Sequence, residues 1–80
     1  MQMRYCKRMT TALDLVRVRR MAATGVARQI RMEAGLSQAE IADAVGVHRV
    51  TLFKWENGRQ RPKGPRALRY GEVLDELAAR

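Results

Sequence analysis

The side chains in this sequence that could do chemistry are mainly cationic. The 80 residues hold 16 Lys and Arg against 8 Asp and Glu, a formal charge of +8, with one cysteine, Cys6, and one histidine, His48. A lone thiol cannot close an internal disulfide, and one Cys with one distant His makes no zinc site. No nucleophile, base and orienting group stand together as catalysis requires. The sequence therefore predicts a binding protein for an anionic partner, with no enzyme activity, metal or cofactor.

The cationic side chains are concentrated in two blocks. Residues 1–31 carry a net charge of +7 and residues 49–69 a net +6, whereas residues 32–48 and 70–80 carry −3 and −2. Such alternation predicts a polarised surface rather than a uniformly charged tail. For the cluster at 49–69, a binding surface explains the charge better than a solvated helix face does.

The length and the apolar pattern predict one small domain outside the membrane. Eighty residues bury too little apolar surface for a layered enzyme with a deep cleft. Lys or Arg interrupts every apolar stretch, and no cleavage site follows the basic N-terminus, so neither a membrane span nor secretion is expected. We expect a flexible N-terminus over 1–10, a single domain over 11–80, and a cytoplasmic location.

Apolar spacing of three and four residues predicts an all-α fold of five short helices around one core. The expected helices cover residues 11–23, 25–34, 37–45, 48–56 and 66–78. Gly71, inside the last of them, predicts a close contact with another helix. The positions expected to face the core are Leu15, Val18, Ala22, Val26 or Ala27, Ile30, Ala34, Ile41, Ala42, Val45, Leu52, Trp55, Ala67, Tyr70, Leu74 and Leu77.

Several helix ends carry recognisable signals. Thr24 is a candidate cap for the second helix, and Gly35 stands where a glycine would end it. Ser37 with Glu40 three residues later forms a capping box, which predicts where the third helix starts. Gly46 then permits the positive φ of a tight turn. Residues 37–57 therefore predict two short helices joined by a turn.

The second helix of this pair, 48–56, is the strongest candidate for a binding element. Leu52 and Trp55 are expected to pin it to the core, and the small Ala42 lets it cross the preceding helix closely. A helix presented in this way fits the major groove of DNA, N-terminal end first. The side chains left with outward surface are His48, Arg49, Val50, Thr51, Phe53 and Lys54.

Two segments carry a family resemblance, GLSQAEIADAVGV from Gly35 and WENG from Trp55. They resemble the Cro/repressor-type (Xre-like) helix-turn-helix proteins of bacteria and phages over about residues 24–77. The resemblance implies a lambda-repressor-like domain with an extra N-terminal helix at 11–23. It also implies a sequence-specific transcriptional regulator of double-stranded DNA, repressor or Cro-like, that works on the nucleoid.

The resemblance assigns roles to individual positions. Arg31 and Glu56 match a structural ion pair that holds the reading helix in place. For His48, a capping role competes with a phosphate contact. For Phe53, a DNA contact, packing on a neighbour and a partner surface stay open. The implied base-reading residues are Arg49, Val50 and Lys54, and the implied backbone contacts are Gln38, His48, Thr51, Asn57, Arg59, Arg61 and Lys63.

The sequence does not decide how the chain assembles, and it is compatible with a second class of function. The chain could bind DNA as a homodimer through its last or its N-terminal helix, or as a monomer. It could instead be an antitoxin-like module that binds a protein partner through residues 1–23 and uses the helix-turn-helix for autoregulation. An RNA-binding or membrane-surface module fits less well, because the chain has only four aromatic residues. Either a longer DNA footprint or a solvated face would explain Arg17, Arg19 and Arg20.

Overall fold

The structure is a computed structural model that describes the backbone from Gln2 to Arg80 and the side chains from Thr11 to Arg80. Within these residues the chain forms five α-helices and no strand, which confirms the expected all-α fold. The helices are α1 (Gln2–Thr24), α2 (Val26–Glu33), α3 (Gln38–Val45), α4 (Arg49–Glu56) and α5 (Gly64–Ala78).

The first and last helices begin earlier than the sequence pattern predicts. α1 starts at Gln2 rather than Thr11, and residues 2–10 contain no Gly or Pro that would break it. α5 starts at Gly64, because Pro65 fits a first helical turn, where no backbone N–H is needed. The prediction of a flexible N-terminus falls on residues 1–10, whose side chains lie outside the described part of the chain.

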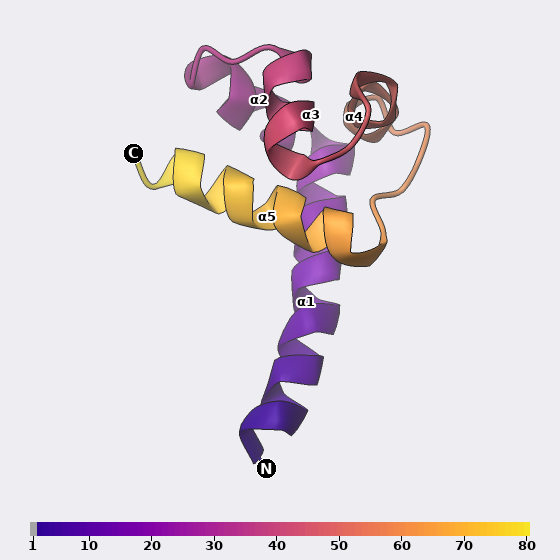
Figure 1. Cartoon of the computed structure of the whole chain (residues 1–80), viewed down its shortest axis with the longest axis vertical. Helices are drawn as coiled ribbons and strands as arrows, with labels where there is room; N and C mark the ends of the chain where they lie inside the picture. The colour runs from indigo at the N-terminus through magenta and orange to yellow at the C-terminus, as the bar shows by residue number, and fades with distance from the viewer. Residues whose placement is uncertain (1) are drawn as a thin grey trace.

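The other four helices assemble on the C-terminal half of α1 (Figure 1). α5 crosses α1; α2 and α4 also pack against α1, and α3 packs against α4 and α5. The N-terminal turns of α1 extend away from the remaining helices, on the opposite side from α3 and α4. The helix-turn-helix segment, α3 and α4, thereby packs against α1 and α5.

The buried positions match most of the expected core. Ala27 is fully buried at the start of α2, while Val26 is 46% exposed, so the second of the two alternatives is correct. Ala34 is exposed, contrary to expectation, because it is the C-cap of α2 where the chain turns away. The buried core consists of Val18, Ala22, Ala27, Ile41, Ala42, Val45, Leu52, Trp55, Ala67, Tyr70 and Leu74. Ile30 and Leu77 are half-buried and pack against this core, and Leu15 is half-buried.

The break between α1 and α2 lies at Gly25. Its φ of 89° is in the left-handed region that glycine adopts without strain, and it is the N-cap residue of α2. Thr24 does not cap α2, contrary to expectation, because it is the last residue of α1. Its hydroxyl instead donates to the Arg20 carbonyl oxygen over 2.8 Å within that helix.

α1 and α5 are in close contact at Gly71. A Cβ at this position would lie 2.6 Å from Cγ2 of Val18, so only glycine fits, which confirms the predicted close helix contact. Beside it, Arg17 donates to both carboxylate oxygens of Asp75, over 2.8 and 3.0 Å. The hydrogen bonds to Asp75 raise the pKa of the Arg17 guanidinium. Arg17 therefore joins two helices instead of being simply solvated.

Candidate nucleic-acid interface

α3 is the first helix of the candidate DNA-binding unit, and local side chains fix where it begins. The backbone N–H of Glu40 donates to Ser37 Oγ over 3.0 Å, and the N–H of Ser37 donates to Glu40 Oε1 over 2.8 Å. This reciprocal pair is the predicted capping box, and it satisfies two N–H groups that the helix itself leaves unpaired. The start of α3 is thus set by its own sequence.

The turn from α3 to α4 depends on Gly46 and His48. Gly46 has φ 88°, and its N–H and that of Val47 both donate to the Ala42 carbonyl oxygen. His48 is extended and is the N-cap of α4, where its Nδ1 accepts from the Val50 N–H over 3.1 Å. Of the two roles considered for His48, the structure places it in the capping one, with Nδ1 already occupied.

α4 is anchored on one side by two buried side chains. Leu52 is fully buried and Trp55 is 3% exposed. The Trp55 ring packs on Tyr70 of α5 with centroids 5.1 Å apart and the planes tilted by 33°. Because such aromatic contacts are geometrically specific, they fix the rotation of α4 about its axis. That rotation decides which side chains point outward.

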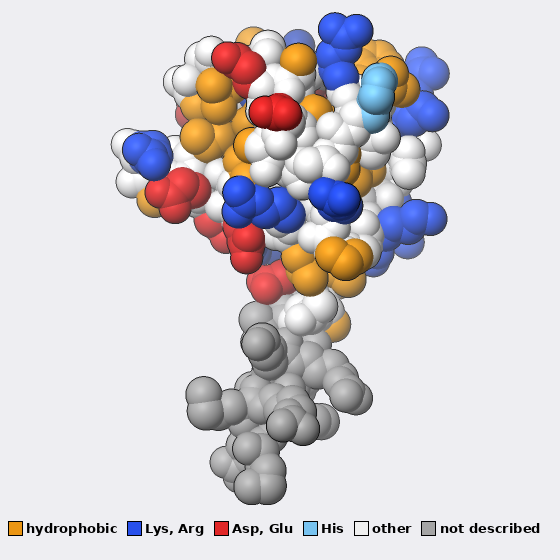
Figure 2. Space-filling model, in the orientation of Figure 1, with side chains coloured by type: hydrophobic (Ala, Val, Ile, Leu, Met, Phe, Trp, Pro, Cys, Tyr) orange, Lys and Arg blue, Asp and Glu red, His pale blue; other side chains and the backbone are white. Residues whose placement is uncertain are grey.

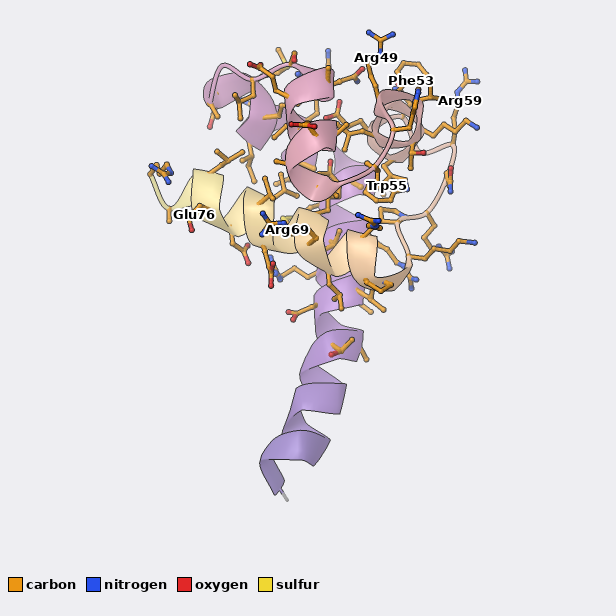
Figure 3. The ribbon with its side chains drawn as sticks, viewed as in Figure 1. Arg49, Phe53, Trp55, Arg59, Arg69 and Glu76 are labelled. Carbon is orange, nitrogen blue, oxygen red and sulfur yellow. The ribbon has the colours of Figure 1, made fainter. Side chains whose placement is uncertain are left out.

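The opposite side of α4 faces solvent. Arg49 and Phe53 project outward, away from the buried Trp55 (Figure 3). Arg49, Val50 and Lys54, the three residues expected to read bases, are all exposed. Thr51 is half-buried at the edge of this surface. The helix can thus enter a groove without disturbing the core.

The end of α4 is tied to α2 and α3 through a buried carboxylate. Glu56 is 1% exposed, and its two oxygens accept from Nε and Nη2 of Arg31 over 2.7 and 3.1 Å. Gln38 Nε2 donates to Glu56 Oε1 over 3.0 Å. The structure therefore places Arg31 and Glu56 against each other. The Gln38 amide, for which the resemblance implies a phosphate contact, is held by the same carboxylate.

The basic loop after α4 is also fixed at both of its ends. Asn57 Nδ2 donates to the Phe53 carbonyl oxygen over 2.8 Å, and the Arg59 N–H donates to the Lys54 carbonyl oxygen over 2.9 Å. At the far end, Arg19 Nε donates to the carbonyl oxygen of the buried Pro62 over 2.7 Å. The side chains of Arg59 and Arg61, before Pro62, and of Lys63, directly after it, are exposed. Arg19 is therefore a positioning residue, a role that the sequence pattern left undecided.

Arg28 is a cation near this surface that the sequence analysis missed. It is exposed on α2 and lines a surface notch together with Gln38, Phe53 and Asn57. Arg28 belongs to the cationic segment 1–31, which is far from α4 in the sequence. Only the packing of the α1–α2 junction beside the end of α4 brings it there, and no local signal could have predicted this. Phe53 lines the same notch, so it lies beside polar groups rather than in the core.

The charges on the surface follow this arrangement. On the described part of the face shown in Figure 2, the side over α4 and the following loop carries Lys and Arg without Asp or Glu. The side over α5 carries both signs. A surface whose charged side chains are all cationic attracts a polyanion such as the DNA backbone.

Among the described residues, no group of three or more His, Cys, Asp and Glu side chains is placed to hold a metal ion. None of the described helices is both long and apolar enough to cross a membrane.

Comparison with known families gives one match. A family model described as helix-turn-helix matches residues 28–78, which cover α3, α4 and α5 and nearly all of α2. No curated protein and no solved structure matches the chain. The matched segment excludes α1, although α1 supplies Val18, Arg17 and Arg19 to the contacts described above.

Proposed function

Because this chain belongs to the Cro/repressor-type helix-turn-helix family, a family of DNA-binding regulators, we propose that it controls transcription by reading double-stranded DNA with α4. In this proposal α4 enters the major groove with its N-terminal end first. The regulator acts on the nucleoid, and its most direct mode of action is repression.

The observation that carries this proposal is the two-sided character of α4. Leu52 and Trp55 hold the helix to the core, while Arg49, Val50 and Lys54 share the outward surface. Arg49 is the first residue of the helix, where side chains reach deepest into a groove. Its guanidinium suits the O6 and N7 acceptors of guanine, and Val50 suits a thymine methyl group.

The residues around α4 supply contacts to the DNA backbone in this proposal. Arg59, Arg61 and Lys63 form an exposed cationic loop that is anchored at Lys54 and Pro62. A loop held at both ends loses little conformational entropy when it binds phosphates. His48 and Asn57 flank the helix and Thr51 lies on it, and we add Arg28 to this set because it lines the notch next to Gln38.

Selection of bound duplexes from a random pool tests sequence-specific reading. We expect the wild type to enrich one motif, and the Arg49→Ala variant to enrich the same motif with one position relaxed. Lys63→Ala is the matched control, since it removes a cation without touching α4, and its motif should be unchanged. Recovery of random sequences by the wild type would contradict the proposal.

One observation favours the antitoxin-like alternative as a second candidate. Leu13 and Val16 of α1 are 66% and 50% exposed and line an apolar groove with Val26. Because Arg20 also lines it, a partner segment with apolar and acidic side chains would fit. Size exclusion of the chain co-expressed with the product of its neighbouring gene distinguishes the two functions. A stable complex that Leu13→Glu abolishes would support the second, whereas a chain that elutes alone would argue against it.

A further inference from the structure

A cleft of about 480 Å³, the α1–loop cleft, lies between the C-terminal half of α1 and the loop that follows α4. This volume is within the range of small-molecule sites in proteins. The apolar wall of the cleft includes Val16 and Ala23 of α1, Trp55 of α4 and Pro62 of the loop. Trp55 and Pro62 are buried, so an apolar group in the cleft would pack against fixed parts of the fold.

Three arginines, Arg19, Arg20 and Arg61, line the same cleft. Arg19 is half-buried, and the hydrogen bond from its Nε to the Pro62 carbonyl oxygen holds its guanidinium while leaving the Nη donors for a ligand. Arg20 and Arg61 are exposed, and no described residue pairs with either guanidinium. No Asp or Glu among the described residues lines the cleft. An anion is therefore the occupant that its charge favours.

The indole of Trp55 supplies an unpaired donor beside the cleft. Trp55 is 3% exposed, and its buried Nε1–H has no hydrogen-bond partner among the described residues. Buried N–H groups are normally paired, because an unpaired one costs free energy. A ligand oxygen that reaches the edge of the ring would provide the missing acceptor.

An aryl carboxylate fits these features better than a phosphate of the DNA backbone does. Guanidinium groups bind a carboxylate through paired N–H donors, and they also stack on aromatic faces. A backbone phosphate would use the arginines but would leave the apolar wall at Trp55 and Pro62 without a partner. The cleft also meets α4 on its core side, since Arg49 and Phe53 project away from Trp55 (Figure 3).

The loop beside the cleft connects it to the DNA-binding proposal. Arg61 lines the cleft and is also one of the proposed contacts to the DNA backbone. A carboxylate in the cleft would pair with Arg61 and add a negative charge next to the loop. Both effects reduce the attraction between the loop and the phosphates.

We propose that the α1–loop cleft binds a small aryl carboxylate through Arg19, Arg20 and Arg61, and that this ligand lowers the affinity of the chain for DNA. The effect on DNA rests on the proposed function, whereas the binding of the ligand does not. Because the two binding equilibria are linked, DNA should lower the affinity for the ligand by the same factor.

A titration with phenylacetate, followed by NMR without DNA, tests the cleft. Trp55 is the only tryptophan of the chain, so its indole N–H gives a single signal. This signal should shift and saturate with a Kd of about 1 mM, as expected for a ligand of few atoms. Phenethyl alcohol, which lacks the charge, and acetate, which lacks the ring, should each bind about tenfold more weakly or worse.

Three variants locate the ligand. Arg20→Gln should weaken phenylacetate binding by about tenfold. Ala23→Leu keeps every charge but fills part of the cleft, so it should weaken binding as well. Arg80→Gln is the matched control, since it removes one exposed arginine outside the cleft, and its affinity should equal that of the wild type. Circular dichroism checks that each variant is folded.

Several outcomes would overturn the binding of an aryl carboxylate. One is a wild type without a saturable shift at phenylacetate concentrations up to about 20 mM. Another is equal weakening in Arg20→Gln and Arg80→Gln. If acetate or inorganic phosphate binds as tightly as phenylacetate, the cleft is a simple anion site, such as one for a DNA phosphate, and the proposal is wrong.

The effect on DNA is measured separately. Saturating phenylacetate should lower the affinity for the selected duplex by about fivefold or more, compared with acetate at the same ionic strength. An unchanged affinity with the cleft occupied would overturn this part of the proposal. A chain that binds phenylacetate but no duplex would support the cleft and contradict the DNA-binding function, so the two failures are distinct.

Discussion

Arg31 of α2 and Glu56 of α4 face each other with both carboxylate oxygens engaged, over 2.7 and 3.1 Å. Arg31 Nη1 also donates to the Leu36 carbonyl oxygen over 2.8 Å, so the guanidinium fixes the α2–α3 connection as well. Arg31 is 12% and Glu56 1% exposed, and Gln38 of α3 shares the carboxylate. Three helices of the candidate DNA-binding unit are therefore joined at one nearly buried carboxylate.

Removing one partner of this pair should destabilise the fold strongly. Arg31→Ala leaves the Glu56 carboxylate buried without its cation, and we expect a loss of about 3–5 kcal/mol in the free energy of unfolding. Replacing both groups with apolar side chains, as in Arg31→Met with Glu56→Leu, should cost clearly less. Urea unfolding followed by circular dichroism measures both. If the double variant is as unstable as Arg31→Ala alone, the ion pair contributes more stability than the free-energy cost of burying its two charges.

Arg49→Ala should reduce discrimination among DNA sequences more than it reduces overall affinity. A bidentate contact between arginine and guanine is worth about 1–3 kcal/mol against the wrong base. Binding to the selected duplex, to duplexes substituted at each position and to a random duplex measures this difference. If Arg49→Ala weakens binding to the selected and the random duplex equally, Arg49 contacts the DNA backbone rather than a base.

The loop cations should contribute affinity without sequence preference. Arg59→Ala and Arg61→Ala should each weaken binding to every duplex alike and reduce the slope of log affinity against log salt by about 1. Both side chains are exposed, so their loss should leave the stability of the fold nearly unchanged. Titrations at several salt concentrations provide the slope. A slope unchanged in both variants would place the loop away from the DNA.

Gly71→Ala should destabilise the protein although alanine is the better helix former. The added methyl would lie 2.6 Å from Cγ2 of the buried Val18, and overpacking of this kind costs about 1–3 kcal/mol. Val18→Ala should relieve the clash, so the double variant should be less unstable than the sum of the two single changes. Thermal unfolding of the four proteins completes this cycle. Simple additivity would show that α1 shifts freely against α5.

Tyr70 should make the fold sensitive to alkali. Burial raises the pKa of its phenol above the usual value of 10.0; the negative charge of Glu56 adds to this effect and Arg31 partly opposes it. Above pH 10 the unfolded chain loses this proton while the folded chain keeps it. The stability from Tyr70 is therefore complete below pH 10 and falls as the pH rises further, by at most about 1.4 kcal/mol per pH unit.

Tyr70→Phe isolates this contribution. Its free energy of unfolding should fall less than that of the wild type between about pH 9 and about pH 11. Near neutral pH the variant should be equally or more stable, because the buried Tyr70 hydroxyl has no hydrogen-bond partner among the described residues. Parallel loss of stability in both proteins across this range would exclude Tyr70 as the source of the alkaline sensitivity.

Patterns within a few residues were enough to predict the helix-turn-helix segment. Ser37 and Glu40 cap α3, Gly46 makes the turn, and Leu52 and Trp55 share the buried side of α4, all as their spacing indicates. Each of these features depends on hydrogen bonds within one turn or on helical periodicity. The sequence alone could therefore determine the all-α fold and the family, and which side chains of α4 point outward.

Contacts between distant segments were decided only by the tertiary structure. Arg17 and Asp75 are 58 positions apart and Arg19 and Pro62 are 43 apart, and nothing near either residue indicates its partner. The same holds for Arg28, which lies beside Phe53 and Asn57 only because the start of α2 packs next to the end of α4. These neighbours depend on how whole helices cross, and the crossing is set by many buried side chains at once. The sequence thus determined α4 and its outward side chains, whereas packing assigned Arg17 and Arg19 to the fold and left Arg28 beside the exposed side of α4.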